Sequence, residues 1–399
     1  MPTPTLDSVH CDRLSQIQQS ILEVAERPFE QAIALPAAAY LDSDFYNWEV
    51  EHIFKQQWLC VGHVSQIPKP GDYVNFDLFN EPMTVVRGQD GVNVLSRVCV
   101  HRAMDMMPAE YGHPPKGNRR SFLCPYHHWS YGLDGQLLGA PHMQQNEGFN
   151  AKEICLHRFR TEIWQGFIFI TFDPTLEPVS QHYAGLLPYV ERWNLAEMEM
   201  VANLQWECDF NWKLLVENFM EPYHHMGAHH KTFEPLMPAT GTWTESETLN
   251  HVVCHLPLAK HLVEKIKAGQ SIETFSSPRT LSSEDHYEYA VYLGNPDFLL
   301  FIGPDQVYWY FLIPQGPDKM ILHTTLLVTP ESKQLDDYEQ KLKQTIEGLQ
   351  RFHMEDMEVC TAMQRGLNSA FYAPGPLSHL EMPIWLFQRY LARQIRAVT

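Results

Sequence analysis

Two short Cys/His pairs in the first half of the chain constrain its fold most strongly. Cys99 and His101 form a C-x-H pair, and Cys124 and His127 form a C-x-x-H pair further along. Short β-prone runs flank both pairs, so we expect each pair on a loop at the tip of a hairpin. Two such loops that share a metal must lie side by side, which requires a β-rich module around them.

The composition of the two loops narrows the choice of metal. A zinc finger normally takes two cysteines from one loop and two histidines from the other. Here each loop supplies one cysteine and one histidine. That pattern suits the Rieske arrangement of a [2Fe–2S] cluster, in which two thiolates hold one iron and two imidazoles hold the other. Zinc and a chance occurrence are the alternatives. The predicted cluster ligands are Cys99, His101, Cys124 and His127.

A second group of candidate ligands lies in residues 211–230. The segment begins with a helical apolar pattern, which Pro222 and Gly227 then interrupt. Imidazole suits iron, zinc, copper or nickel, so the group predicts a metal site, with a solvated polar helix end as the alternative. The side chains concerned are Glu217, Glu221, His224, His225, His229 and His230.

Helical periodicity leaves the choice among these histidines open. His225 and His229 are four residues apart and would share one face of an unbroken helix. His224 and His229 are five apart, about 140° round a straight helix. They can meet only if the helix bends or ends between them.

Composition excludes some partners. A formal net charge of −19 over 399 residues argues against nucleic acid and against an anionic membrane surface. We see no signal peptide and no apolar stretch of about 18 residues that could span a bilayer. The eight cysteines are scattered rather than arranged as a secreted disulfide framework. We therefore expect a reducing, cytoplasmic setting.

The pattern of the chain changes along its length. Helical patterns occupy parts of residues 1–35 and 41–60, and a β-rich module follows to about residue 172. From residue 204 helical and β-prone segments alternate. Residues 336–366 read as one long amphipathic helix. The length suggests two or three domains.

Together these motifs resemble the α subunit of Rieske non-haem iron oxygenases. The resemblance rests on the two Cys/His loops and on Glu221-x-x-His224-x₄-His229. Residues 54–63 look like the segment that enters the Rieske domain, and residues 124–131 look like its second loop. Residues 350–369 look like the helix that supplies the third iron ligand. Glu221, where many members have Asp, is similar to the carnitine and glycine betaine oxygenases.

The resemblance implies an α+β fold in two domains. Residues 46–175 would form a β-rich Rieske [2Fe–2S] domain. Residues 176–399 would form a helix-grip (START-like) catalytic domain, with an antiparallel sheet and a long C-terminal helix. Residues 1–45 would be a helical segment packed on the catalytic domain.

The resemblance also selects the iron ligands that periodicity leaves open. It excludes His225, His230 and Glu355 as ligands of the mononuclear iron. Two imidazoles and one carboxylate on one face of Fe(II) form a facial triad that leaves positions open for O₂. The implied ligands of the mononuclear iron are His224, His229 and Asp356.

Partners follow from the same resemblance. An NAD(P)H-dependent flavin or iron–sulfur reductase would supply electrons, and O₂ and a small organic molecule would be the substrates. Glu221 would bridge His224 to a cluster histidine of the next subunit, in a homotrimer or a multiple of it. The simpler reading is that Glu221 only orients His224.

Two features depart from the family. An insertion surrounds residues 112–120, and His128 stands where the family commonly has glycine. If that position requires a positive φ, histidine is strained there.

Three functions are compatible with these motifs. The first is a monooxygenase that hydroxylates or demethylates a small substrate such as a methylated amine. The second is a ring-hydroxylating dioxygenase that makes cis-diols. The third is a non-catalytic electron carrier. A cationic substrate would bind to aromatic faces. Aromatic residues that could line the pocket, although each alone is more often a core residue, are Tyr223, Phe298, Phe301, Trp309, Tyr310 and Phe311.

Overall fold

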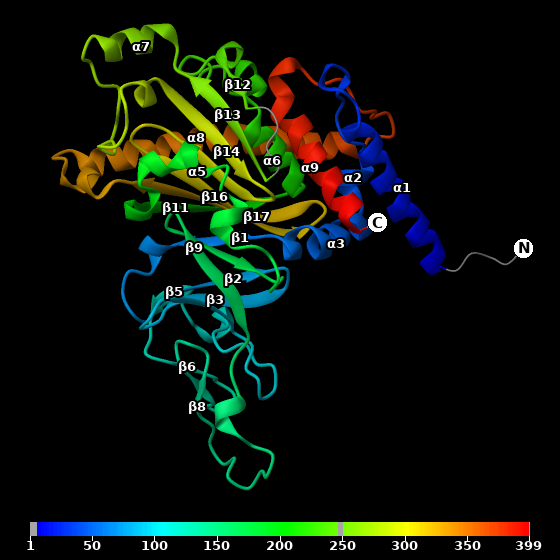
Figure 1. Ribbon diagram of the computed structural model, residues 1–399, viewed down its shortest axis with the longest axis vertical. Helices are drawn as coiled ribbons and strands as arrows, with labels where there is room; N and C mark the ends of the chain where they lie inside the picture. The colour runs from blue at the N-terminus through cyan, green and yellow to red at the C-terminus, as the bar shows by residue number, and fades with distance from the viewer. Residues whose placement is uncertain (1–5, 246–249, 399) are drawn as a thin grey trace, which may run out of the picture. The chain divides into compact units, whose positions relative to one another are not determined.

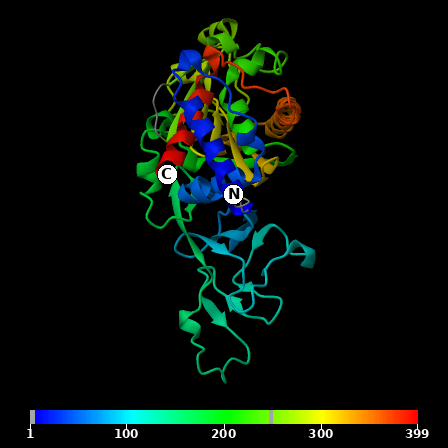
Figure 2. The ribbon, with the colours of Figure 1, turned by 90° about the vertical axis from the view of Figure 1, so that its right-hand side faces the viewer.

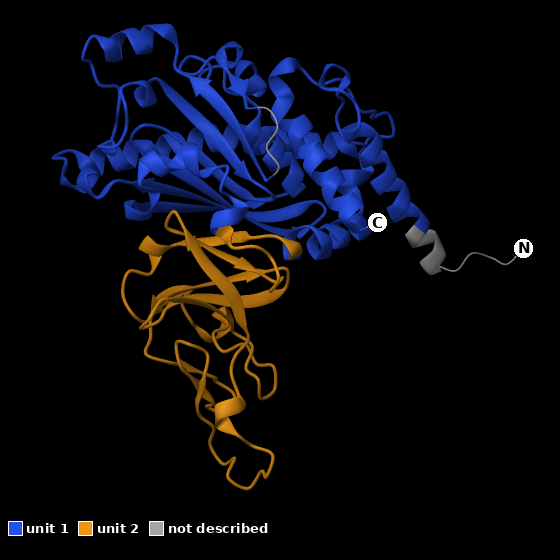
Figure 3. Ribbon diagram, in the orientation of Figure 1, with its two compact units in different colours: residues 1–55, 180–399 blue, residues 56–179 orange. Residues whose placement is uncertain are grey.

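The computed structural model describes residues 6–245 and 250–398 and divides the chain into two compact units. Unit 1 comprises residues 1–55 and 180–399, and unit 2 comprises residues 56–179 (Figure 3). We expected the β-rich domain to begin at residue 46, whereas residues 46–55 group with unit 1.

Unit 2 is built on antiparallel strands, as the β-prone runs predict. Its larger sheet has the order β1-β10-β9-β4-β3-β2-β5, and β6, β7 and β8 form a smaller sheet. A turn over residues 89–91 joins β3 to β4, where the Gly88 N–H donates to the Gly91 carbonyl oxygen at 2.7 Å. The strands are β1 (Leu59–His63), β2 (Asp72–Leu78), β3 (Glu81–Arg87), β4 (Val92–Ser96), β5 (Lys116–Asn118), β6 (Phe122–Leu123), β7 (Ser130–Tyr131), β8 (Leu137–Gly139), β9 (Arg158–Trp164) and β10 (Phe167–Thr171).

The insertion around residues 112–120 supplies an edge strand. β5 pairs with β2, with Asn118 opposite Asp72. The Arg119 N–H donates to the Gly71 carbonyl oxygen at 2.9 Å, and the Arg119 guanidinium lies 5.8 Å from the centre of the Tyr73 ring. The extra residues therefore extend the sheet rather than form a free loop.

Unit 1 contains a second antiparallel sheet, with the order β11-β17-β16-β15-β14-β13-β12. Its central strands are buried along nearly their whole length, so both faces of the sheet are covered. This sheet and the long helix α8 give the α+β fold that we predicted. The strands are β11 (Glu199–Cys208), β12 (Trp243–Thr244), β13 (His251–Pro257), β14 (Glu288–Gly294), β15 (Phe298–Ile302), β16 (Val307–Gly316) and β17 (Lys319–Val328).

Two helices of unit 1 position the candidate metal ligands. α8 packs against α6 and β11, and Figure 1 shows it running along the sheet. The Asn211 side chain caps α6 by accepting a hydrogen bond from the Lys213 N–H at 2.9 Å. The helices are α1 (Leu6–Ala25), α2 (Ala38–Leu41), α3 (Ser43–His52), α4 (Val179–His182), α5 (Leu187–Val190), α6 (Trp212–Met220), α7 (Lys260–Lys267), α8 (Tyr338–Leu367) and α9 (Met382–Val398).

The two ends of the chain pack together inside unit 1. α1 lies beside α9 (Figure 2) and also contacts α3. The ammonium of Lys213 on α6 lies 2.6 Å from a Glu49 carboxylate oxygen on α3, and both side chains are fully buried. Removing one partner would leave a buried charge unpaired, so this pair ties the N-terminal segment to α6. Within the described ranges, no helix combines the length and apolar composition that crossing a membrane requires.

Candidate cluster and mononuclear metal sites

The fold of unit 2 brings the two Cys/His loops together. Cys99 and His101 follow β4, and Cys124 and His127 lie between β6 and β7. Both cysteines are 1% exposed, and the Cys99 sulfur lies 3.3 Å from the Tyr131 hydroxyl. The two imidazole rings have their centres 4.6 Å apart. Paired thiols and paired imidazoles on opposing loops fit a cluster with two thiolate and two imidazole ligands.

The two loops repeat one backbone geometry. The Ala103 N–H donates to the Cys99 carbonyl oxygen, and the His128 N–H donates to the Cys124 carbonyl oxygen, both at 3.0 Å. Ala103 has φ 56° and His128 has φ 60°. His128 therefore adopts the positive φ that we considered from sequence, at a position where glycine would be unstrained.

Packing leaves one side of this site open. His127 is exposed and His101 is partly exposed in unit 2, whereas both cysteines are buried. The His101 ring stacks on Trp129 with a centroid distance of 4.7 Å and an interplanar angle of 8°. The imidazole side of the site is thus the side that faces solvent in this unit.

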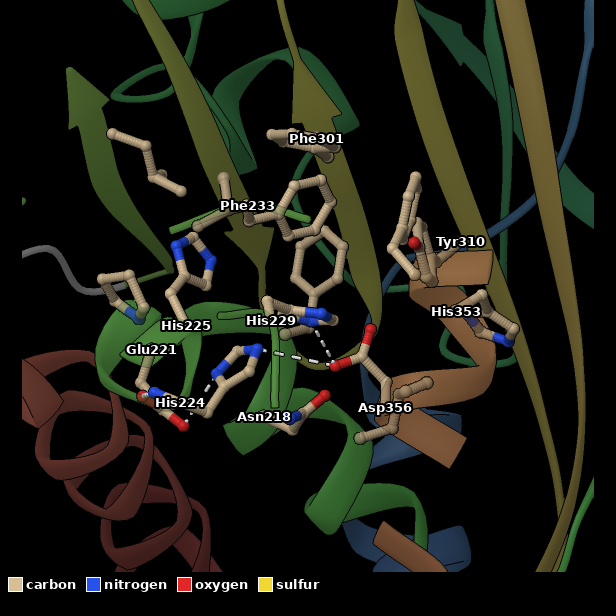
Figure 4. Close-up of a pocket in the computed structure, with 16 residues that line it drawn as sticks. Asn218, Glu221, His224, His225, His229, Phe233, Phe301, Tyr310, His353 and Asp356 are labelled. Atoms are coloured by element: carbon tan, nitrogen blue, oxygen red, sulfur yellow. Dashed lines mark hydrogen bonds and ion pairs between the residues drawn. The ribbon is translucent and has the colours of Figure 1, made fainter. Parts of the chain in front are cut away.

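Unit 1 gathers the second group of ligands. Ligand atoms of His224, His229 and Asp356 all lie within 4.8 Å of one another, the one such group of three in the part of the chain that the structure describes. Asp356 Oδ1 is 2.9 Å from His229 Nε2 and 3.5 Å from His224 Nε2 (Figure 4). Two imidazole nitrogens and one carboxylate oxygen around one point fit the facial triad of a ferrous ion.

The end of α6 explains how histidines five residues apart can meet. α6 stops at Met220, and Pro222 opens a 3₁₀ turn that extends to Met226. The chain therefore bends between His224 and His229, as convergence requires.

The two histidines that the resemblance excludes as iron ligands contact backbone carbonyl oxygens instead. His225 Nδ1 lies 3.1 Å from the Met237 carbonyl oxygen. His230 is exposed, and its Nδ1 lies 3.0 Å from the Gly227 carbonyl oxygen. Neither histidine belongs to the group of three.

A carboxylate stands behind each imidazole of the triad. Glu221 Oε1 lies 3.0 Å from His224 Nδ1, and Glu355 Oε2 lies 2.6 Å from His229 Nδ1. Thr232 donates a hydrogen bond to the same Glu355 oxygen at 2.7 Å. Such partners fix the tautomer, so that Nε2 of each ring is left for a metal. Sequence reasoning considered Glu355 only as a rival of Asp356 and missed this role.

The electrostatics of the group favour a bound cation. Burial alone would lower the pKa of His224, but Glu221 and Asp356 outweigh it and raise the pKa to about 10. Burial would raise the pKa of Asp356, but hydrogen bonds from His224 and His229 hold it well below its usual value. The carboxylate is therefore ionised, as a metal ligand must be.

An aromatic wall stands beside the triad. Of the six predicted aromatic residues, Phe301 and Tyr310 line the pocket. Trp309 and Phe311 alternate with Tyr310 along β16 and so point to the other face of the sheet. No sequence signal marks the remaining wall residues, which come from three different segments. They are Phe219, Phe233 and Phe352.

The other two predicted aromatic residues also lie outside the pocket lining. Phe298 is fully buried against Tyr183, and Tyr223 is 43% exposed. Among the described residues that line the pocket, none is lysine or arginine.

Comparison with known proteins agrees with this geometry. The family model described as "Ring hydroxylating alpha subunit (catalytic domain)" matches residues 195–397, half of the chain, and the model of the Rieske [2Fe–2S] domain matches residues 57–160. The fold and sites define a Rieske-type oxygenase that uses a [2Fe–2S] cluster and a mononuclear iron. The chain belongs to the ring-hydroxylating α-subunit family and is an enzyme, not a non-catalytic electron carrier.

Similar proteins extend over nearly the whole chain. The chloroplastic choline monooxygenase of Arabidopsis thaliana is 25% identical over 396 residues, which cover 96% of this chain and 88% of that protein. A solved quaternary ammonium Rieske monooxygenase is 23% identical, with a TM-score of 0.78, over 94% of this chain and 98% of the other. Naphthalene 1,2-dioxygenase from Rhodococcus has a TM-score of 0.77 at 20% identity, over 96% and 98%. These structural likenesses show the fold.

Proposed function

We propose that this oxygenase hydroxylates or oxidatively demethylates a methylated ammonium compound. The observation that carries the proposal is the aromatic wall beside the triad, in a pocket without a described lysine or arginine. Aromatic faces attract a quaternary ammonium through their negative quadrupoles. The similar proteins named for choline and for quaternary ammonium compounds support the same class.

We assign different roles to the residues that line the pocket. His224, His229 and Asp356 would hold the iron from one side and leave the side toward the aromatic wall open. When bound, ferrous iron activates O₂, and the cluster supplies an electron. Among the described lining residues, Glu221 is the one carboxylate besides Asp356, and its charge favours a cationic substrate.

A single turnover tests this function. The purified protein would be reduced chemically, freed of reductant and exposed to ¹⁸O₂ with pools of quaternary ammonium compounds and of arenes. We expect a product with one labelled oxygen, or formaldehyde, from the ammonium pool. The aromatic wall also fits an arene, and a doubly labelled cis-diol from the arene pool would replace this proposal with the dioxygenase function.

We further propose that Glu221 carries the electron-transfer path between subunits of a homotrimer, or of a multiple of it. Glu221 already holds His224 through Nδ1 at 3.0 Å and through the backbone N–H at 3.1 Å. A hydrogen bond to a cluster histidine of the next subunit would complete the path, by analogy with the family.

Glu221→Gln and Glu355→Gln form a matched pair for this test. Each removes the charge behind one imidazole of the triad. In stopped-flow experiments with substrate and O₂, at ferrous ion concentrations that fill the mononuclear site of both variants, we expect Glu221→Gln alone to slow cluster reoxidation. Equal cluster reoxidation rates in the two variants would reduce Glu221 to an orienting role.

The remaining partners are also part of the proposal. An NAD(P)H-dependent flavin or iron–sulfur reductase would deliver electrons to the cluster. A reducing, cytoplasmic compartment is consistent with the seven cysteines that the structure describes, none of which is in a disulfide. Mixing the protein with candidate reductases and following NAD(P)H-dependent cluster bleaching identifies the partner.

A further inference from the structure

His225 contributes to the pocket without belonging to the triad. Its side chain is 4% exposed and lines the same pocket. The ring centre lies 5.4 Å from that of Phe233 and 5.7 Å from that of His229. Figure 4 shows the ring standing beside Phe233, with one ring nitrogen turned toward the middle of the pocket. This imidazole is therefore placed to contact a substrate.

A backbone carbonyl fixes the tautomer of this ring. His225 Nδ1 lies 3.1 Å from the Met237 carbonyl oxygen, which can only accept a hydrogen bond. Nδ1 must therefore carry the hydrogen, and in the neutral ring Nε2 presents a lone pair. Among the described residues, no hydrogen bond to Nε2 occurs. The pocket thus contains an acceptor that matches a donor on the substrate.

The charges of the pocket discriminate between two kinds of ammonium compound. A betaine or a carnitine carries a carboxylate, and an ammonium alcohol carries a hydroxyl. The described lining residues include no lysine or arginine to pair with a carboxylate, and burying an unpaired carboxylate is costly. A hydroxyl is neutral, and it can donate to an imidazole nitrogen.

We infer that the substrate is an ammonium alcohol whose hydroxyl donates a hydrogen bond to Nε2 of His225, and that His225 is a specificity-determining residue. This inference rests on the proposed function and names the substrate class within it. The atoms and electrons of the proposed reaction balance as in any monooxygenase: one C–H bond, O₂, two electrons and two protons give C–OH and water. The reductase supplies the electrons. Attack at an N-methyl group gives a hydroxymethyl group that leaves as formaldehyde: the hydroxyl proton is released to solvent, and the amine nitrogen retains the electron pair of the broken C–N bond.

Four compounds separate the contributions of the substrate's cation, hydroxyl and carboxylate to kcat/KM in the wild-type enzyme at pH 8. Choline has the cation and the hydroxyl, and propyltrimethylammonium replaces the hydroxyl by a methyl group. Glycine betaine and L-carnitine carry a carboxylate. With a working reductase, we expect choline to have the highest kcat/KM for product formation. The loss on replacing its hydroxyl should be about tenfold, the size of one net hydrogen bond.

Two variants assign that loss to His225. His225→Leu removes the acceptor, so the ratio of kcat/KM for choline to that for propyltrimethylammonium should fall about tenfold, mainly through KM. Taking the ratio within one protein cancels any change in folding or iron content. His230→Leu is the matched control, because His230 also approaches a carbonyl oxygen through Nδ1 but is exposed and outside the pocket lining. Its ratio should equal that of the wild type.

The outcomes distinguish the inference from the proposed function. If His225→Leu leaves the ratio unchanged, or if a carboxylate-bearing compound is preferred to choline, the ammonium-alcohol assignment is wrong and the proposed function stands. If none of the four ammonium compounds is oxidised while an arene is, the proposed function fails and this inference fails with it.

Discussion

The two metal sites of this chain are built in opposite ways. The proposed cluster ligands come from two neighbouring loops, whereas Asp356 reaches the proposed triad from a helix more than a hundred residues beyond His224. In unit 2 the His127 imidazole is exposed, and in unit 1 the His229 imidazole is fully buried. An exposed ligand edge shortens the path for electrons that arrive from a partner. The side chains of His224 and Asp356 are 15% and 13% exposed, so the triad is largely shielded from water.

The groups that contact the imidazoles also differ between the two sites. His101 rests on the neutral face of Trp129, whereas each triad imidazole is backed by a carboxylate, Glu221 or Glu355. A carboxylate partner raises the basicity of a metal-bound imidazole. We therefore expect the triad to hold a single exchangeable divalent ion, and the buried thiolates of Cys99 and Cys124 to contribute most to holding the cluster. Variants that affect only one of the two metal sites can test this difference.

Cys124→Ser should have the largest effect. It removes one of two buried thiolates, so the cluster should be lost and unit 2 should unfold at a lower temperature, because metal binding contributes folding free energy. Turnover should vanish. Acid-labile sulfide, visible absorbance and thermal unfolding measure these changes. A variant that keeps its sulfide and its absorbance would remove Cys124 from the ligand set.

Asp356→Ala should abolish turnover while leaving the other site intact. The variant should lose one iron per chain and keep its sulfide, because the proposed triad of described residues loses its carboxylate. Iron and sulfide analysis of the purified protein provides the measurement. The matched control is Glu358→Ala, which removes an exposed carboxylate of the same helix. Unchanged iron content in Asp356→Ala would contradict the assignment.

Glu355→Gln should weaken the triad without destroying it. Loss of the charge behind His229 should lower the affinity for mononuclear iron about 10- to 100-fold, the usual cost of removing such a partner. Titration of the iron-depleted protein with ferrous ion, read by recovery of turnover, gives the affinity. An affinity equal to that of the wild type would show that Glu355 is not needed to orient the ring.

His128→Gly should have the smallest effect, and it should be stabilising. Glycine relieves the positive φ and costs some unfolded-state entropy, so we expect a net gain of about 0.5–1 kcal/mol. The loss of cluster absorbance on heating should shift upward by a few degrees. Ala103→Gly, at the equivalent position of the other loop, should behave alike. A lower transition temperature in both would show that the left-handed geometry is not strained.

The proposed cluster ligands could be named from the sequence because their motifs are local. Two short motifs with mixed Cys/His composition already imply two adjacent loops, and the structure places those four side chains together. The β-rich module and the long helix followed from periodicity. The proposed triad was harder to predict, because the bend after Pro222 decides whether His224 or His225 approaches His229 and Asp356, and periodicity assumes a straight helix.

What sequence could not predict depends on long-range packing. Phe233 and Phe352 reach the pocket from separate segments, and neither has a local signal that marks a wall residue. Strand alternation would have separated Tyr310 from Trp309, but the sequence does not say which face of β16 the pocket occupies. The pairing of Glu355 with His229 likewise appears only after α8 packs against α6.

The central claim is that one chain holds iron in two places with the ligands named above. An iron anomalous-difference map of crystals of the loaded enzyme tests it most directly. The account predicts a two-iron feature between the Cys99/His101 and Cys124/His127 loops, and a single peak bonded to His224, His229 and Asp356. A single peak bonded to His225 instead, or no peak at the triad in an enzyme that turns over, would contradict it.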